Sequence, residues 1–88
     1  MKIHLKVNFA PDLNEVETES STLGDLLLEL SKKYPDAKFY NKERGEVIFD
    51  QFVELNGEMH DSLPRELDTR LKDGDSLEIY SGIDYPED

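Results

Sequence analysis

The sequence predicts a small α+β domain in which a mixed sheet of about five strands is covered on one face by one main helix. Two observations favour this class. Apolar and polar residues alternate near both ends of the chain, over residues 1–8 and 76–80, with the period of a half-buried strand. Between them, residues 23–34 carry leucines at helical spacing. A single amphipathic helix can cover one sheet face and leave the other polar.

The first two strands are expected to form a hairpin. From Met1 to Asn8 the sequence alternates, and the apolar residues share one face: Ile3, Leu5, Val7 and Phe9. Ala10–Asp12 breaks this pattern, and Leu13–Glu19 alternates again more weakly. The second segment suits a solvated edge, where Glu15, Glu17 and Glu19 would repel their counterparts in a second copy. We therefore expect a monomer when the protein is free.

The main helix is expected to begin after Thr22 and to end before Pro35. Thr22 is a typical N-cap residue, and Asp25 lies three positions later, where it meets the exposed amides of the first turn. The apolar residues at helical spacing are Leu23, Leu26, Leu27, Leu30 and Tyr34. A helix this short gains its stability by covering a sheet, so we interpret the stripe as core and not as a cofactor site.

The segment from Asp36 to Asp50 is the least regular. Residues 41–46 have the composition of an exposed loop, whereas residues 47–49 either begin a strand or pin the loop to the body. Phe52–His60 then has two extended arms around Asn56-Gly57, the pair preferred where both turn residues need a positive φ. We predict a β-hairpin there.

The last part of the chain is predicted to form a short helical turn or loop over Ser62–Leu71 and then the closing strand. Leu71–Asp75 contains an Asp-Gly turn signal that directs the chain into Ser76–Tyr80. Leu77 and Ile79 lie on one face of that strand, and Glu78 and Tyr80 on the other. We expect the strand to pair inside the sheet. Residues 1–83 then form one domain, and residues 84–88 form an acidic C-terminal tail.

Composition and charge exclude several functional classes. The 88 residues include no cysteine, so disulfides, thiolate metal sites and cysteine nucleophiles are ruled out. The net charge is −11 and the basic residues are scattered, so we expect no binding to nucleic acid. The sequence has no secretion-signal pattern and no apolar run that could span a membrane, and we expect a cytoplasmic protein.

We expect no enzyme activity, metal or cofactor. His4 and His60 are the two histidines, and we interpret them as solvated residues and not as metal ligands. Asp73 and Asp75 are expected to shape a turn instead of acting as acid, base or cation ligands. The serines and threonines have no neighbouring histidine with a supporting carboxylate, and the glycines do not form a phosphate-binding loop.

Element order and two turns resemble a known family. The order strand, strand, helix, strand, strand, short turn, strand is that of the β-grasp, or ubiquitin-like, fold. Leu55–Glu58 and Leu71–Asp75 before the closing strand resemble the MoaD/ThiS-type sulfur carriers of molybdopterin and thiamin biosynthesis. Those proteins end in Gly-Gly, whose carboxylate is adenylated and converted to a thiocarboxylate. The resemblance implies a protein partner, either an adenylating enzyme or a cofactor-biosynthesis subunit.

The tail departs from this family. Counted from the closing strand, Tyr85 and Pro86 occupy the two glycine positions, and Glu87 and Asp88 follow. A bulky ring, a fixed φ without an amide hydrogen and added charge each conflict with delivery of a terminal carboxylate. We therefore expect a non-catalytic accessory protein that binds another protein in molybdenum- or tungsten-cofactor or sulfur metabolism. An active sulfur carrier or a ubiquitin-like modifier is the alternative, and a relative in fold only is a third.

Partner binding is expected to use the exposed sheet face and the tail. The predicted apolar anchors are Tyr80, Ile83 and Tyr85, and the charges expected to meet a basic rim are Asp84, Glu87 and Asp88. The alternative is that Ile83 covers the edge of the core while the last residues fray.

Overall fold

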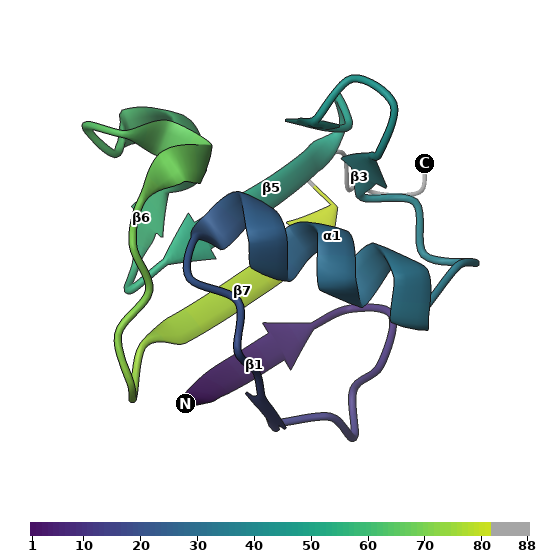
Figure 1. The fold of residues 1–88 in the computed structure, drawn as a ribbon. Helices are drawn as coiled ribbons and strands as arrows, with labels where there is room; N and C mark the ends of the chain where they lie inside the picture. Colours follow the sequence, from purple (N-terminus) through teal and green to yellow (C-terminus); the bar gives the residue numbers. More distant parts are fainter. Residues whose placement is uncertain (82–88) are drawn as a thin grey trace, which may run out of the picture.

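The central sheet has five strands in the order β2-β1-β7-β5-β6 (Figure 1). The structure is a computed structural model and describes residues 1–81. β1 (Lys2–Val7) and β7 (Ser76–Ser81) run parallel, and β5 (Gln51–Leu55) pairs antiparallel with β7 on its other side. The closing strand therefore pairs inside the sheet, as predicted. The predicted mixed sheet with one main helix, the β-grasp arrangement, is confirmed.

The first hairpin is present, but its second strand is short. β1 alternates as predicted, with Ile3, Leu5 and Val7 buried. β2 (Glu15–Glu17) forms the sheet edge and pairs with residues 2–4, so it covers only the middle of the predicted 13–19. Thr18, the next residue, is 4% exposed; its backbone exchanges hydrogen bonds of 2.9 Å with Met1 in both directions, and its hydroxyl donates to Glu29 of the helix.

The main helix, α1 (Leu23–Lys33), has the predicted start and end. The Thr22 hydroxyl accepts a hydrogen bond from the Asp25 amide at 3.2 Å, and the Tyr34 amide donates to the Leu30 carbonyl just before Pro35. α1 lies across one face of the sheet (Figure 1). The buried core comprises Ile3, Leu5, Val7, Val16, Leu23, Leu26, Leu27, Leu30, Phe39, Val53, Leu55, Leu71, Leu77 and Ile79.

Residues 36–50 form a small second hairpin. β3 (Tyr40–Asn41) pairs with β4 (Glu46–Val47), and the loop between them is exposed, as predicted. Val47 both belongs to a strand and packs against the core, so both interpretations of this residue hold, whereas Phe49 is 92% exposed. The burial of Phe39 was not predicted from the sequence: this residue is 1% exposed and stacks on Phe9 with ring centroids 5.1 Å apart.

Two turns fix the far end of the sheet. Asn56 and Gly57 have φ values of 53° and 85° between β5 and β6 (Glu58–Met59), which confirms the predicted hairpin. Asp75 accepts hydrogen bonds from the Lys72 amide at 2.8 Å and from the Asn56 side chain at 3.0 Å, so it links the two turns. Asp75 therefore shapes a turn, as predicted, whereas the Asp73 carboxylate accepts a hydrogen bond from the Lys2 amide at the start of β1.

The connection between β6 and the closing strand contains two short 3-10 helices. These are η1 (His60–Ser62) and η2 (Glu66–Asp68), and they confirm the predicted short helical turn. Glu66 in η2 has a φ of 50°, a left-handed conformation that non-glycine residues adopt at some cost. No helix within residues 1–81 is long and apolar enough to cross a bilayer.

Candidate protein-binding surface

The sheet face opposite α1, here called the open face, carries a compact group of four side chains. In β7 and β5 the buried residues point toward α1, and the alternate residues point to the open face. The alternate residues are Phe52, Glu54, Glu78 and Tyr80, all partly buried, and we call them the acidic–aromatic patch. Strand register places Phe52 opposite Tyr80 and Glu54 opposite Glu78.

The two aromatic residues of the patch pack edge to face. The rings of Phe52 and Tyr80 have centroids 5.3 Å apart and planes inclined by 80°. Such pairs are worth about 0.5–1.5 kcal/mol beyond the area they bury. Each ring is held by its neighbour across the strands, so the patch presents a preorganised apolar surface beside its charges.

Tyr80 is also fixed by a hydrogen bond, because its hydroxyl donates to a carboxylate oxygen of Glu54. This hydrogen bond is the main cause that raises the pKa of Tyr80 from 10.0 to about 12. Desolvation and the negative charges of Glu54 and Glu78 add to the effect. All of these favour the neutral phenol, which can donate a proton to the carboxylate, over the phenolate, which would be repelled by it.

The Tyr80 pKa gives a direct spectroscopic prediction. Subtracting the phenolate absorbance of Tyr80→Phe from that of the native protein isolates the titration of Tyr80. This titration should have a midpoint at a pH of about 12. Because the folded-state pKa is raised, the stability that Tyr80 contributes is complete below about pH 10 and is lost as pH rises through about 12. Glu54→Gln should lower the midpoint. A native midpoint near the ordinary value, with the fold intact by circular dichroism, would contradict the Tyr80–Glu54 contact.

The carboxylates of the patch are a pair of like charges. Residues directly opposite across an antiparallel pair lie close together, and like charges there are destabilising. Within residues 1–81 the ion pairs are Met1–Glu17, Lys2–Glu15 and Arg44–Glu46, so neither Glu54 nor Glu78 belongs to one. Lys6 is in register with Glu78 on β1 but forms no ion pair with it. The pair is therefore available to a cation from outside.

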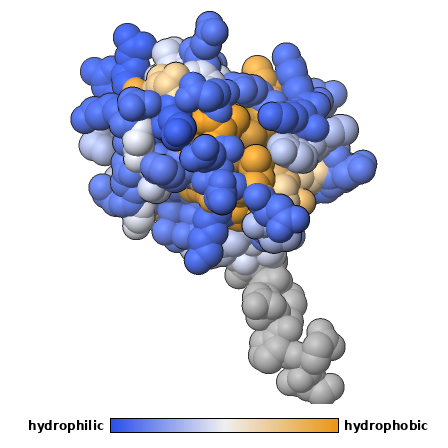
Figure 2. Space-filling view, turned by 90° about the horizontal axis from the view of Figure 1, so that it is seen from below, coloured by the Kyte–Doolittle hydropathy of each residue, from blue (hydrophilic) through white to orange (hydrophobic). Residues whose placement is uncertain are grey.

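Shallow grooves flank the patch on the β1 side. One is lined by Leu13, Lys6, Glu78 and Tyr80 among others, and a second by His4, Lys6, Glu54 and Glu78 among others. Figure 2 views the molecule from below and shows an apolar area within a largely hydrophilic face. The grooves are open, which suits contact with another protein surface better than enclosure of a small substrate.

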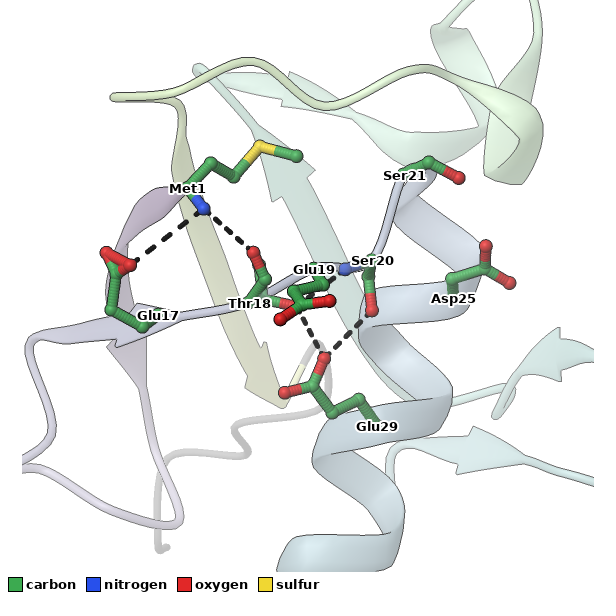
Figure 3. A pocket seen from close by; sticks show the side chains of 8 residues that line it. All are labelled: Met1, Glu17, Thr18, Glu19, Ser20, Ser21, Asp25 and Glu29. Carbon is green, nitrogen blue, oxygen red and sulfur yellow. Dashed lines mark hydrogen bonds and ion pairs between the residues drawn. The ribbon is translucent and has the colours of Figure 1, made fainter.

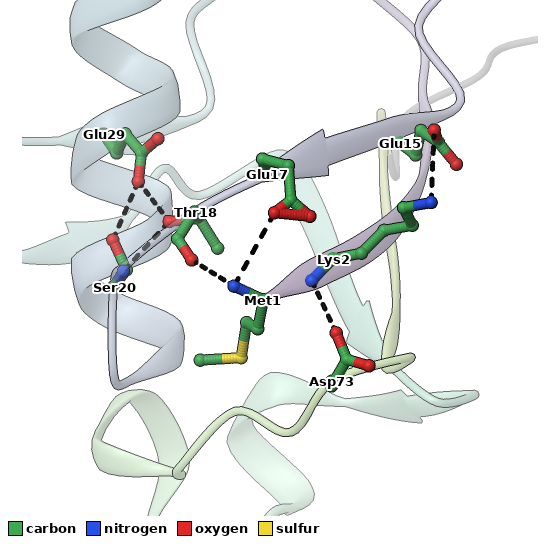
Figure 4. A network of polar contacts seen from close by, with 8 residues as sticks. All are labelled: Met1, Lys2, Glu15, Glu17, Thr18, Ser20, Glu29 and Asp73. Carbon is green, nitrogen blue, oxygen red and sulfur yellow. Dashed lines mark hydrogen bonds and ion pairs between the residues drawn. The ribbon is translucent and has the colours of Figure 1, made fainter.

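A second polar cluster lies between β2 and the start of α1, and we assign it a structural role. Glu29 of α1 accepts hydrogen bonds from the hydroxyls of Thr18 and Ser20, the latter at 2.8 Å, within an acidic hollow (Figure 3). The amino group of Met1 donates to the Thr18 carbonyl at 2.9 Å and lies 3.9 Å from Glu17 (Figure 4). These contacts tie the sheet edge to the helix.

The Lys2 contacts extend the same network to the closing turn. The Lys2 amide donates to Asp73 at 2.7 Å, and its ammonium group lies 3.8 Å from Glu15 (Figure 4). Within the described part of the chain, no group of three or more histidine, aspartate or glutamate side chains could hold a metal ion. The prediction of a solvated residue holds for His4, which is exposed on β1. It is wrong for His60 at the start of η1, which is half-buried and whose Nδ1 atom is buried without a hydrogen-bond partner among the described residues.

Of the contact residues predicted from the sequence, Tyr80 lies within the part of the chain that the structure describes. It lies on the open face, as the alternation of the closing strand indicated. The other predicted contact residues lie outside the described residues: Ile83, Asp84, Tyr85, Glu87 and Asp88. Phe52 and Glu54 were not predicted from the sequence as neighbours of Tyr80. Because side chains alternate along a strand, residues 52 and 54 of the predicted hairpin were expected to share one face. Their register with the closing strand, however, is set by the whole fold.

Comparison with known protein families gives a match to the ThiS family over residues 6–80. The chain belongs to the ThiS family. This result confirms the resemblance to ThiS/MoaD-type ubiquitin-like sulfur carriers that the turns and element order indicated. No curated protein sequence matches this ThiS-family chain.

Solved structures share its fold. Small archaeal modifier protein 1 from Methanosarcina acetivorans is 21% identical with a TM-score of 0.72, covering 97% of this chain and 96% of its own. A chain of the Amycolatopsis orientalis BexX/CysO complex is 17% identical with a TM-score of 0.69, covering 97% and 98%. A putative molybdopterin converting factor subunit 1 from Pyrococcus furiosus is 22% identical with a TM-score of 0.59, covering 93% and 95%. These matches show the β-grasp fold.

Proposed function

We propose that this ThiS-family chain is a non-catalytic accessory protein that binds another protein through the open face of its sheet. The observation that carries the proposal is the acidic–aromatic patch, in which two cross-strand carboxylates that form no ion pair within residues 1–81 lie beside two packed rings. Protein interfaces are enriched in aromatic anchors, and complementary charge selects the partner. One of the structural relatives is itself described as part of a two-protein complex, which supports a partner of this kind.

The residues after β7 support binding over carboxylate transfer. The family resemblance implies adjacent glycines beyond the closing strand, and the five glycines of this sequence occupy positions 24, 45, 57, 74 and 82, none of them adjacent. Tyr85 and Pro86 stand at the positions counted for the pair. Proline fixes φ and tyrosine is bulky, so this segment would fit poorly into a channel shaped for glycine. The partner proposed is a subunit or enzyme of cofactor or sulfur metabolism.

The proposal is tested by affinity capture from host extract. Glu78→Lys reverses one charge at the centre of the patch, and Glu43→Lys makes the same change in the exposed loop between β3 and β4. We expect native protein and Glu43→Lys to recover the same partner, whereas Glu78→Lys should lose about tenfold or more of it, because a like charge across an interface is costly. Equal recovery by all three forms would exclude the open face as the interface.

An active sulfur carrier or protein modifier is a second candidate. It is favoured by the solved structures described as a small archaeal modifier protein and as a putative molybdopterin converting factor subunit. This candidate requires activation by an ATP-dependent adenylating enzyme. Intact mass spectrometry of protein from its own host should then show a sulfur-for-oxygen replacement at a terminus, together with enzyme-dependent pyrophosphate exchange. If neither the sulfur-for-oxygen replacement nor the pyrophosphate exchange is observed, the result favours the protein-binding function over the carrier function.

A further inference from the structure

The acidic–aromatic patch combines two neighbouring carboxylates with two packed rings. Glu54 and Glu78 are direct cross-strand partners, so their side chains leave the sheet side by side. The Tyr80 hydroxyl donates to one oxygen of Glu54, and the structure gives no further hydrogen bond to either carboxylate among residues 1–81. Most of the acceptor capacity of the two carboxylates is therefore open, next to the ring pair of Phe52 and Tyr80.

We propose that this patch binds an arginine side chain presented by the partner protein, an inference that rests on the proposed function. A guanidinium group is planar and carries five N–H donors, so it can bridge two neighbouring carboxylates while its face lies on an aromatic ring. A lysine ammonium group is more strongly hydrated and lacks both the fork and the stacking plane. The chain's net charge of −11 adds long-range attraction for a basic partner segment.

Among residues 1–81, no cationic side chain forms an ion pair with the carboxylates of the patch. The closest cationic position in register is Lys6 of β1, opposite Glu78, and the two side chains form no ion pair. His4 lines the adjoining groove with Glu54 and Glu78. Both groups border the patch from one side, so an incoming guanidinium would enter over β5 and β7, where the rings and carboxylates lie.

The test uses small probes and the full-length protein. Isotope-labelled protein is titrated with N-acetyl-arginine methylamide, and with the matched citrulline and lysine derivatives, at constant ionic strength. We expect saturable amide shifts centred on residues 52, 54, 78 and 80 with the arginine probe. The lysine probe should bind about threefold more weakly, and the neutral citrulline probe should show no saturation.

Four variants separate the contributions. Glu54→Gln and Glu78→Gln should each weaken arginine binding about three- to tenfold, as expected for a partly exposed charged contact. Glu43→Gln, in the exposed loop, should leave it unchanged. Tyr80→Phe keeps the ring and frees the Glu54 oxygen, so it should bind at least as well as native protein. Equal binding of citrulline, tighter binding of lysine, or unchanged affinity in both patch variants would overturn the proposal.

The outcomes for the arginine site and for the proposed function can be told apart. If Glu78→Lys abolishes capture of the partner while the arginine probe does not bind, the arginine site is wrong and the open face remains the interface. If the arginine probe binds as expected but Glu78→Lys captures the partner normally, the patch holds a cation without serving as the partner interface.

Discussion

Leu27→Ala should lower the free energy of unfolding by about 2–5 kcal/mol, as large an effect as we expect from any single truncation in α1. Leu27 has no exposed surface and lies in the core between helix and sheet. Removing its side chain loses the burial of its methyl groups and leaves a cavity that a close-packed core fills only in part. A small domain has one core, and a loss of this size is a large fraction of its total stability.

Chemical denaturation with urea measures this effect, and the next residue offers a matched control. Leu28 is partly exposed and does not belong to the core cluster, so Leu28→Ala removes the same atoms from a different environment. We expect it to cost about 1 kcal/mol or less. Equal losses for both variants would mean that α1 is not oriented on the sheet as described.

Restoring the missing glycines should convert the chain into a substrate for adenylation. The change is Tyr85→Gly with Pro86→Gly and a chain ended at residue 86. It provides small residues and a terminal carboxylate at the position used by the carriers that the sequence resembles. The redesigned form should support pyrophosphate exchange by an activating enzyme from a related carrier system, whereas the native form should not.

Two controls make this redesign interpretable. Both forms must show the same thermal unfolding, and a chain ended at residue 86 with Tyr85 and Pro86 retained separates the effect of length from that of the glycines. Exchange by neither form would mean that the open face has also lost the surface that such an enzyme contacts. Exchange by the native form would contradict the non-carrier assignment.

Local patterns in the sequence were enough to predict most of the fold. Alternation located β1 and β7, the leucine stripe and Thr22 located α1, and Asn56-Gly57 located a hairpin, because each signal depends on residues close in the chain. The extent of β2 was not predictable in this way. It pairs only with residues 2–4 of β1, and this register is a property of the assembled sheet.

Only part of the candidate site could be predicted from local sequence patterns. Tyr80 could be placed on the open face from alternation within its own strand. Its neighbours Phe52 and Glu54 could not, because β5 and β7 are far apart in the chain and acquire their register from the whole sheet. Phe39 was missed for a related reason, since a single aromatic residue in an irregular segment has no period that would reveal its burial.

The central claim is that the open face of the sheet binds another protein, and hydrogen exchange with the captured partner tests it most directly. Comparing the free and bound protein, we expect slower exchange in β5 and β7, at residues 51–55 and 76–81, while the amides of α1 are unchanged. Protection confined to α1 or to the exposed loop between β3 and β4, with β5 and β7 unaffected, would contradict the claim.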